Sequence, residues 1–155
     1  MAAGKFTLFE ANLDDLRLAD LSGTANLRLA LVASAYTPSS GPTGHSLWAD
    51  VSTNELAAAN GYATGGAALT SAALLTAAKG FALDSADVVW TAAGGDIAAH
   101  RYYVMYYLGT LWGKTNPLIG YFVGDTTPAD IPATTAGNTL TVTVPAAGWF
   151  SQQQA

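Results

Sequence analysis

HRYYVMYYLG at residues 100–109 and PLIGYFV at residues 117–123 decide the fold of this chain. Successive side chains of an extended strand point to opposite faces, and in both segments both sets are mostly apolar or aromatic. A strand of this kind is covered on both sides, by its own core or by a neighbouring molecule. Gly113–Asn116 offers turn residues between the two segments. We therefore expect a central hairpin that the rest of the chain pairs with or covers.

The composition indicates a single domain with few surface charges. The chain has 155 residues and 16 glycines, and charged residues make up 11% of it. Ordinary soluble proteins contain about 25% charged residues. So few charges do little to keep molecules apart, and we expect much of the surface to be buried against other subunits. A sticky but monomeric domain is the alternative.

Charge and residue usage exclude several classes of partner. The net charge is -5, and the six Lys and Arg residues form no basic stripe, so direct nucleic-acid binding is not expected. The absence of cysteine excludes disulfides and thiolate metal sites. No apolar run reaches the roughly 18 residues that a membrane span needs. The first residues lack the apolar core of a signal peptide, which favours a soluble product of the cytoplasm.

The N-terminal segment has a helical pattern. Phe6, Phe9, Leu13 and Leu16 recur at i, i+3, i+7 and i+10, which predicts an amphipathic helix over residues 6–21 that ends at Ser22-Gly23. Such a helix packs on its own domain or docks on a neighbour. A second, short helical turn is predicted over residues 53–59, because Ser52 and Glu55 have the spacing of a capping box.

Alternating segments predict the strands. Residues 26–34 place three leucines on one face, with Arg28 and Ala30 on the other. Further strands are expected over residues 81–83, 87–92 and 139–144, and Trp149-Phe150 is expected to end the sheet. Residues 67–78 suit a helix by their alanine content, but their glycine-bounded position favours a strand. Between residues 35 and 46 lies a long loop rich in proline, glycine and serine, and such loops often make contacts.

These elements predict a mainly β fold, an antiparallel β-sandwich or barrel-like domain with one N-terminal amphipathic helix and a short second helix. The whole chain, residues 1–155, is expected to form one domain. We divide it into an N-terminal helix or arm (residues 1–25), the β-sandwich (residues 26–150) and a polar tail (residues 151–155).

The sequence offers little for catalysis. It contains no phosphate-binding glycine loop, dinucleotide fingerprint or zinc-binding His-Glu helix. Ser46, His100 and Asp96 can be combined on paper into a hydrolase triad, but no nucleophile elbow supports it. A calcium site at Asp84, Asp87 or Asp125 is possible in principle, although aspartates at such positions commonly shape turns. We therefore expect no catalytic residue, no cofactor and no metal site.

Aromatic residues are the richer signal. The chain has four tryptophans and seven tyrosines, more than one small core needs. Tyr and Trp combine a large apolar area with a polar atom and are enriched in protein interfaces. We rank contact with other subunits first, core packing second and an aromatic groove for sugar third.

Several segments together resemble a family of small virion proteins of tailed bacteriophages. The resemblance runs in order from about residue 5 to residue 150, and no single piece of it is specific. The pieces are Lys5-Phe6, residues 26–31, Leu47-Trp48-Ala49-Asp50-Val51, Asn60-Gly61-Tyr62, Gly65-Gly66, Val89-Trp90-Thr91-Ala92, Gly94-Gly95, Arg101-Tyr102 and Pro117-Leu118-Ile119-Gly120-Tyr121. The chain departs from the family at Trp112-Gly113-Lys114 and in its Gln-rich tail.

The resemblance implies a β-rich structural protein without catalysis, with capsid cement or decoration as the expected role. The expected partners are the major capsid protein and copies of this chain, on the capsid surface of the virion. A tail or fibre component, or a module that binds carbohydrate or a host receptor, is the alternative. The residues expected at the interface are Phe6, Phe9, Leu13, Tyr36, Trp48, Tyr103, Tyr107 and Trp112.

Overall fold

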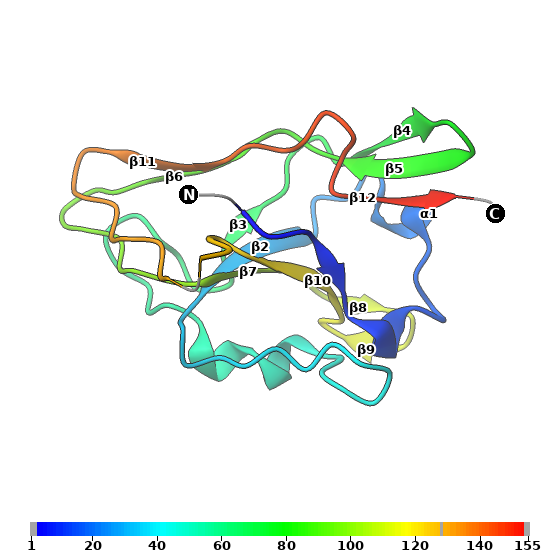
Figure 1. Cartoon of the computed structure of the whole chain (residues 1–155), viewed down its shortest axis with the longest axis horizontal. Coiled ribbons are helices and arrows are strands. Elements are labelled where there is room, and N and C mark those ends of the chain that lie inside the picture. Colours follow the sequence, from blue (N-terminus) through cyan, green and yellow to red (C-terminus); the bar gives the residue numbers. More distant parts are fainter. Residues whose placement is uncertain (1–2, 128, 154–155) are drawn as a thin grey trace.

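A five-stranded antiparallel sheet forms the centre of the molecule. The structure is a computed structural model that describes residues 3–127 and 129–153. In spatial order the strands of the sheet are β1 (Thr7–Leu8), β10 (Leu118–Val123), β7 (Tyr102–Tyr107), β2 (Leu27–Val32) and β3 (Ala67–Ala68) (Figure 1). The predicted hairpin of β7 and β10 is confirmed and lies in the interior of this sheet. The mainly β, antiparallel class is confirmed as well, and the sheet is open.

Smaller sheets complete the fold. One contains, in spatial order, β12 (Phe150–Gln153), β5 (Gly80–Asp84) and β4 (Ala73–Ala77), and another pairs β11 (Thr139–Val142) with β6 (Val88–Thr91). In Figure 1 these two sheets lie above the large sheet, and the long loop that follows β2 runs below it. The remaining pair, β8 (Thr110–Leu111) and β9 (Lys114–Thr115), extends the central hairpin. Its turn is at Trp112 and Gly113, both with positive φ, and not at residues 113–116 as expected.

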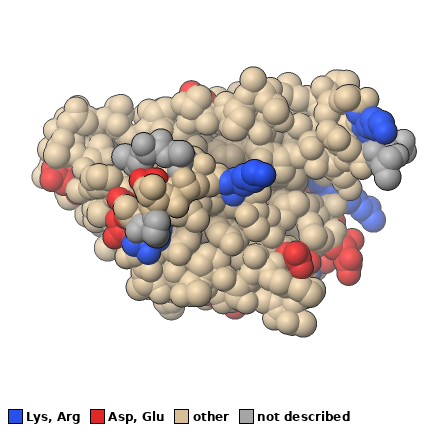
Figure 2. All heavy atoms as spheres, viewed as in Figure 1, with Lys and Arg blue, Asp and Glu red and all other residues tan. Residues whose placement is uncertain are grey.

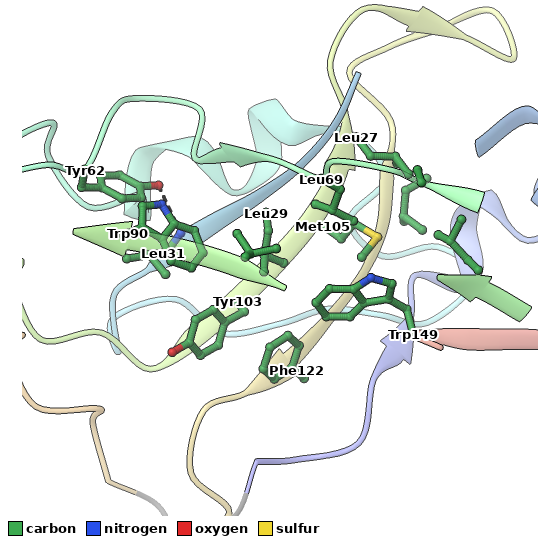
Figure 3. Packing of buried hydrophobic residues seen from close by; sticks show 14 of the residues in the cluster. Leu27, Leu29, Leu31, Tyr62, Leu69, Trp90, Tyr103, Met105, Phe122 and Trp149 are labelled. Atoms are coloured by element: carbon green, nitrogen blue, oxygen red, sulfur yellow. Dashed lines mark hydrogen bonds between the residues drawn. The ribbon is translucent and has the colours of Figure 1, made fainter. Parts of the chain in front are cut away.

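The two faces of the central strands build two separate cores. One face of β2 and β7, with Leu29 and Met105, packs against Trp90 of β6 and against Trp149, which directly precedes β12 (Figure 3). On the other face, residues such as Ala30 and Tyr106 belong to a second cluster. It contains Phe9, Tyr36, Trp48 and Val51 from the N-terminal segment and the long loop. The chain itself therefore covers both faces of its central hairpin.

Most strand predictions are confirmed. The segments at residues 26–34, 81–83, 87–92 and 139–144 correspond to β2, β5, β6 and β11. The strand chosen for residues 67–78 is present as β3 and β4, interrupted near Ser71, whose φ of 57° breaks the extended backbone. Residues 151–153 of the predicted polar tail are exposed, and they belong to β12, which pairs with β5. Residues 154–155 of that tail lie outside the described residues.

The predicted amphipathic helix at residues 6–21 is wrong. This segment forms the short strand β1, a 3-10 turn η1 (Glu10–Asn12) and the four-residue helix α1 (Leu18–Leu21). β1 pairs with β10, and the amide of Phe9 continues the pairing with a hydrogen bond of 3.1 Å to the carbonyl oxygen of Ile119. Phe6 packs against the first core and Phe9 belongs to the second. The two rings therefore lie on opposite faces of a sheet, and the edge of β10 decides this arrangement.

The predicted helix at residues 53–59 is also wrong. Two 3-10 turns, η2 (Trp48–Asp50) and η3 (Ser52–Asn54), stand near this position. The Glu55 carboxylate does not cap Ser52, because its Oε1 accepts hydrogen bonds from the Tyr62 hydroxyl (2.8 Å) and the Gly65 amide (2.6 Å). Asp50 caps the first turn, η2, instead. Its Oδ2 accepts hydrogen bonds from the amides of Ser46 and Leu47, and these bonds lower the pKa of the Asp50 carboxyl group.

A buried asparagine fixes the N-terminal segment to the rest of the fold. Asn12 is 2% exposed, and its Nδ2 donates to the carbonyl oxygens of Ser46 (2.7 Å) and Leu118 (2.8 Å). Its Oδ1 accepts a hydrogen bond of 2.8 Å from Lys114 Nζ, which also contacts the Asp15 carboxylate at 2.8 Å. One side chain thus connects η1 with the long loop, β10 and β9.

We predict that Asn12→Ala lowers the free energy of unfolding by about 3 kcal/mol, because it removes the three hydrogen bonds of a buried side chain, two of them to backbone carbonyl groups. Urea denaturation measures this change. Asp15→Asn is the matched control, since it removes only a partly exposed ion pair and should change stability by less than about 1 kcal/mol. Equal effects of the two variants would contradict a special role of Asn12.

Candidate functional site

An apolar groove of about 470 Å3 lies between the N-terminal segment and β11. We call it the β11 groove. Its floor contains the aromatic rings of Tyr103, Phe122 and Trp149. Residues 3–6 form one side, residues 140–143 form the other, and Ile131 also lines the hollow. A hollow with apolar and aromatic walls of this size is typical of binding sites.

Stacked aromatic rings build the floor of the β11 groove. The rings of Tyr103 and Phe122 stack at 4.6 Å, and Phe122 lies 6.2 Å from Trp149. Phe6 reaches this layer because Gly120 of β10, which pairs with Leu8, has no side chain: a Cβ there would come within 2.3 Å of the Phe6 ring. Phe6 then stacks on Phe150 at 5.4 Å. The position of the groove therefore depends on the pairing of β1 with β10.

A second, smaller hollow continues this apolar surface. It measures about 120 Å3 and contains Leu8, Leu13, Leu16 and Phe150 among its walls. Phe150 also stacks on Phe6, a wall of the β11 groove, so this ring pair joins the two hollows. Leu13 remains 42% exposed. Figure 2 shows that large areas of the face drawn carry no Lys, Arg, Asp or Glu, which agrees with the low charge content of the sequence.

The structure places half of the residues predicted at an interface inside their own chain. Phe9, Tyr36, Trp48 and Tyr103 are between 1% and 8% exposed. Trp48 stacks on Tyr106 at 4.3 Å, and the Tyr36 hydroxyl lies 2.9 Å from Nδ1 of His45. In this conformation these side chains offer a partner almost no area. The rings of Phe9, Tyr36 and Trp48 stabilise the second core instead, and Tyr103 packs in the first core.

The other predicted interface residues keep some exposed area. Leu13 is exposed, whereas Phe6, Tyr107 and Trp112 are half-buried. The indole nitrogen of Trp112 donates a hydrogen bond of 2.8 Å to Asp20 Oδ2, and the Tyr107 hydroxyl accepts one of 3.0 Å from Asn26. The structure brings Phe6 and Tyr103 together in the β11 groove and does not bring Tyr36, Trp48 and Trp112 to it.

The residues of the hypothetical triad have other roles. Asp96 Oδ1 accepts a hydrogen bond from the Ala136 amide, and the Ser46 carbonyl oxygen is bound by Asn12. The His100 ring is buried, and no side chain within residues 3–127 and 129–153 forms a hydrogen bond with either of its nitrogens. No hydrogen bond found in residues 3–127 and 129–153 joins these three side chains.

The candidate calcium residues act mainly in loops. Asp125 Oδ1 accepts from the amide and the hydroxyl of Thr127, and Asp87 Oδ1 accepts from the Val144 amide. Such bonds are typical of aspartates that shape turns. Within the described part of the chain, no three His, Asp or Glu side chains come together as a group that could hold a metal ion.

Comparison with known proteins gives no relative to argue from. No protein-family model, no curated protein and no solved structure matches the chain. Over the described ranges, no helix has the length and apolar character needed to cross a membrane.

Sequence reasoning missed the β11 groove as a site. Lys5, Thr141 and Val142 contribute to it, but none of them was expected at an interface. The alternation at residues 139–144 predicted the strand, but the pattern contains no information on which strand lies next to it. Because a helix was predicted for residues 6–21, the contribution of the N-terminal segment to the other side of the groove was missed as well.

His100 is a buried titratable group beside the β11 groove. It is 1% exposed, and its ring lies edge-on to that of Tyr103 at 4.9 Å. Burial lowers the pKa of His100 from 6.5 to about 4, although the Ala98 carbonyl and the Asp130 carboxylate favour the charged form. The folded chain thus keeps this imidazole neutral at pH values where an unfolded chain protonates it.

We predict that folding stability falls as the pH is lowered from about 6.5 to about 4, because only the unfolded state takes up a proton at His100 in this range. The loss attributable to this residue is about 3 kcal/mol, and it is absent above pH 6.5. Urea denaturation at half-unit pH steps measures it. His100→Phe should flatten the curve between these pH values. An unchanged slope in His100→Phe would show that another group is responsible.

Proposed function

We propose that this chain is a non-enzymatic structural protein of a tailed-bacteriophage particle. The proposed role is that of a capsid cement or decoration protein, which stabilises contacts between capsid subunits. Its proposed partners are the major capsid protein and further copies of itself, at the capsid surface of the virion. Synthesis in the host cytoplasm is part of the same proposal.

The observation that carries the proposal is the apolar surface formed by the β11 groove and the neighbouring small hollow. It adjoins the N-terminal segment of a chain in which only 11% of the residues are charged. A repeated subunit gains from such a surface, since each contact buries apolar area at roughly 25 cal/mol per Å2 and is made in many copies. The ordered resemblance of residues 5–150 to small phage virion proteins gives the proposal its direction.

The second candidate from the sequence, a carbohydrate-binding or receptor-binding module, finds less support. Sugar binding by stacking needs aromatic faces that solvent can reach. Trp48, Trp90 and Trp149 are at most 8% exposed, and Trp112 is half-buried with its indole nitrogen bound to Asp20. A tail or fibre component remains the alternative within the virion, because it would use the same apolar surface.

We also propose a sandwich rather than a barrel as the architecture. The support is that Leu29 and Met105 of the large sheet share one buried cluster with Leu83 of β5 and Trp90 of β6. Sheets that face each other through such a cluster, with their edges left open, form a sandwich.

We predict that the chain is present in purified particles of the phage that encodes it, in hundreds of copies if it binds a capsid lattice. Quantitative mass spectrometry of purified particles, with the major capsid protein as the internal reference, gives the copy number. A handful of copies would assign it to a vertex or the tail. Complete absence from particles would contradict the virion proposal in all its forms.

The same particles provide a functional control. If the chain cements the capsid, particles lacking it should lose their DNA at a lower temperature than complete particles, and purified chain should restore the difference. Release of DNA is followed by the fluorescence of an intercalating dye during heating. Particles that contain the chain but do not depend on it for heat stability would support a tail role instead.

A further inference from the structure

The β11 groove runs along the edge of a strand. Residues 140–143 all line it, although successive residues of a strand point to opposite faces. A hollow that contacts three successive residues of β11, from Leu140 to Val142, therefore follows the backbone edge and not one face of the strand. In the part of the chain that the structure describes, β11 has β6 as its sole neighbour in the sheet, so its other edge is free.

The register of the β6–β11 pair identifies the free backbone groups. The Ala92 amide donates a hydrogen bond of 2.9 Å to the carbonyl oxygen of Asn138. Thr141 pairs with Val89, three residue pairs further along the ladder from Asn138 and Ala92. Hydrogen-bonded and non-hydrogen-bonded pairs alternate in an antiparallel ladder, so Thr141 is in a non-hydrogen-bonded pair and its N–H and C=O point away from β6. Outside the β6–β11 ladder, the described residues provide no hydrogen-bond partner for Thr141.

The walls of the groove indicate the chemistry of an occupant. Phe122, Trp149 and Val142 present apolar surface, and Lys5 is the one charged residue among those that line the hollow. Neither of the ion pairs in the described residues, Arg101–Asp130 and Lys114–Asp15, includes Lys5. An occupant with apolar side chains and a carboxylate complements such a site. A free strand edge in addition favours an extended backbone over a compact small molecule.

We propose that the β11 groove binds an extended polypeptide segment of a partner protein, which adds as a strand to the free edge of β11. The segment has apolar side chains at alternate positions, which pack on Phe122 and Trp149, and an acidic side chain that pairs with Lys5. Its main chain bonds to the N–H and C=O of Thr141. The preference for such a segment rests on the groove alone. Its assignment to a neighbouring subunit of the particle rests on the proposed function.

Blocked peptides test the preference directly. The probes are acetyl-Thr-Val-Asp-Val-Thr-amide and the same peptide with Lys in place of Asp, each titrated into the 15N-labelled full chain. We expect the Asp peptide to shift the amide resonances of Thr141 and Lys5 and to protect the Thr141 amide from hydrogen exchange. The Lys peptide should bind about threefold more weakly, as the loss of a partly exposed ion pair implies. 1-Octanol serves as the probe for a simple apolar pocket.

Two variants with matched controls separate backbone pairing from side-chain contact. Thr141→Pro removes the free N–H but none of the bonds to β6, and the extended residue before it tolerates proline. It should weaken binding of the Asp peptide about tenfold, the equivalent of one hydrogen bond, whereas Thr141→Val should bind like the original chain. Lys5→Glu should reverse the preference between the two peptides. The resonances of β2 and β7 in each variant report that the fold is retained.

The proposal is overturned if neither peptide affects Thr141, if only 1-octanol does, or if Thr141→Pro binds as well as Thr141→Val. These outcomes do not depend on the virion proposal. If the chain is found in particles and its Thr141→Pro variant assembles into them equally well, the proposed function stands and the strand-addition site is contradicted. If the chain binds the Asp peptide as expected but is absent from particles, the strand-addition site stands and the proposed function is contradicted.

Discussion

The fold depends on the need to cover both faces of the hairpin formed by β7 and β10. Tyr103 and Met105 belong to one cluster, and Val104 and Tyr106 belong to the other. An antiparallel sheet with one polar face can leave that face to solvent, but this hairpin cannot, because either face alone would expose a row of large apolar side chains. The β4–β5–β12 and β6–β11 sheets cover one face. The long loop and the N-terminal segment cover the other.

The cover on the second face is irregular backbone, and buried or partly buried hydrogen bonds hold it in place. Loop segments bury few apolar side chains for the amount of backbone that they order, so their polar groups need partners within the protein. Asn12 and Glu55 provide several of these partners. The stack of Trp48 on Tyr106 then joins the loop to the central strand. This use of aromatic rings explains how a chain with four tryptophans and seven tyrosines buries most of them without a neighbour.

On the first face the cover is incomplete, and the β11 groove results. β6 and β11 form a two-stranded sheet of their own, and β1 contributes two residues to the large sheet, so the layer between them is not closed by backbone pairing. The β11 groove is therefore an apolar surface that lies at a strand edge. Edge strands are the places where a β protein can pair with another chain. The low charge content that suggested association is thus accompanied by an apolar groove at a defined place in the fold.

The sequence by itself determined the antiparallel β class, the central hairpin and most strands, because two-residue alternation reports directly which side chains share a face. It did not determine the N-terminal segment: Phe6 and Phe9 are three residues apart, which fits one face of a helix and equally fits opposite faces of a strand. The edge of β10 and the space above Gly120 decided between the two. The free edge of β11 and the position of Lys5 beside it were likewise decided by tertiary structure, since a local pattern cannot specify which strands remain unpaired.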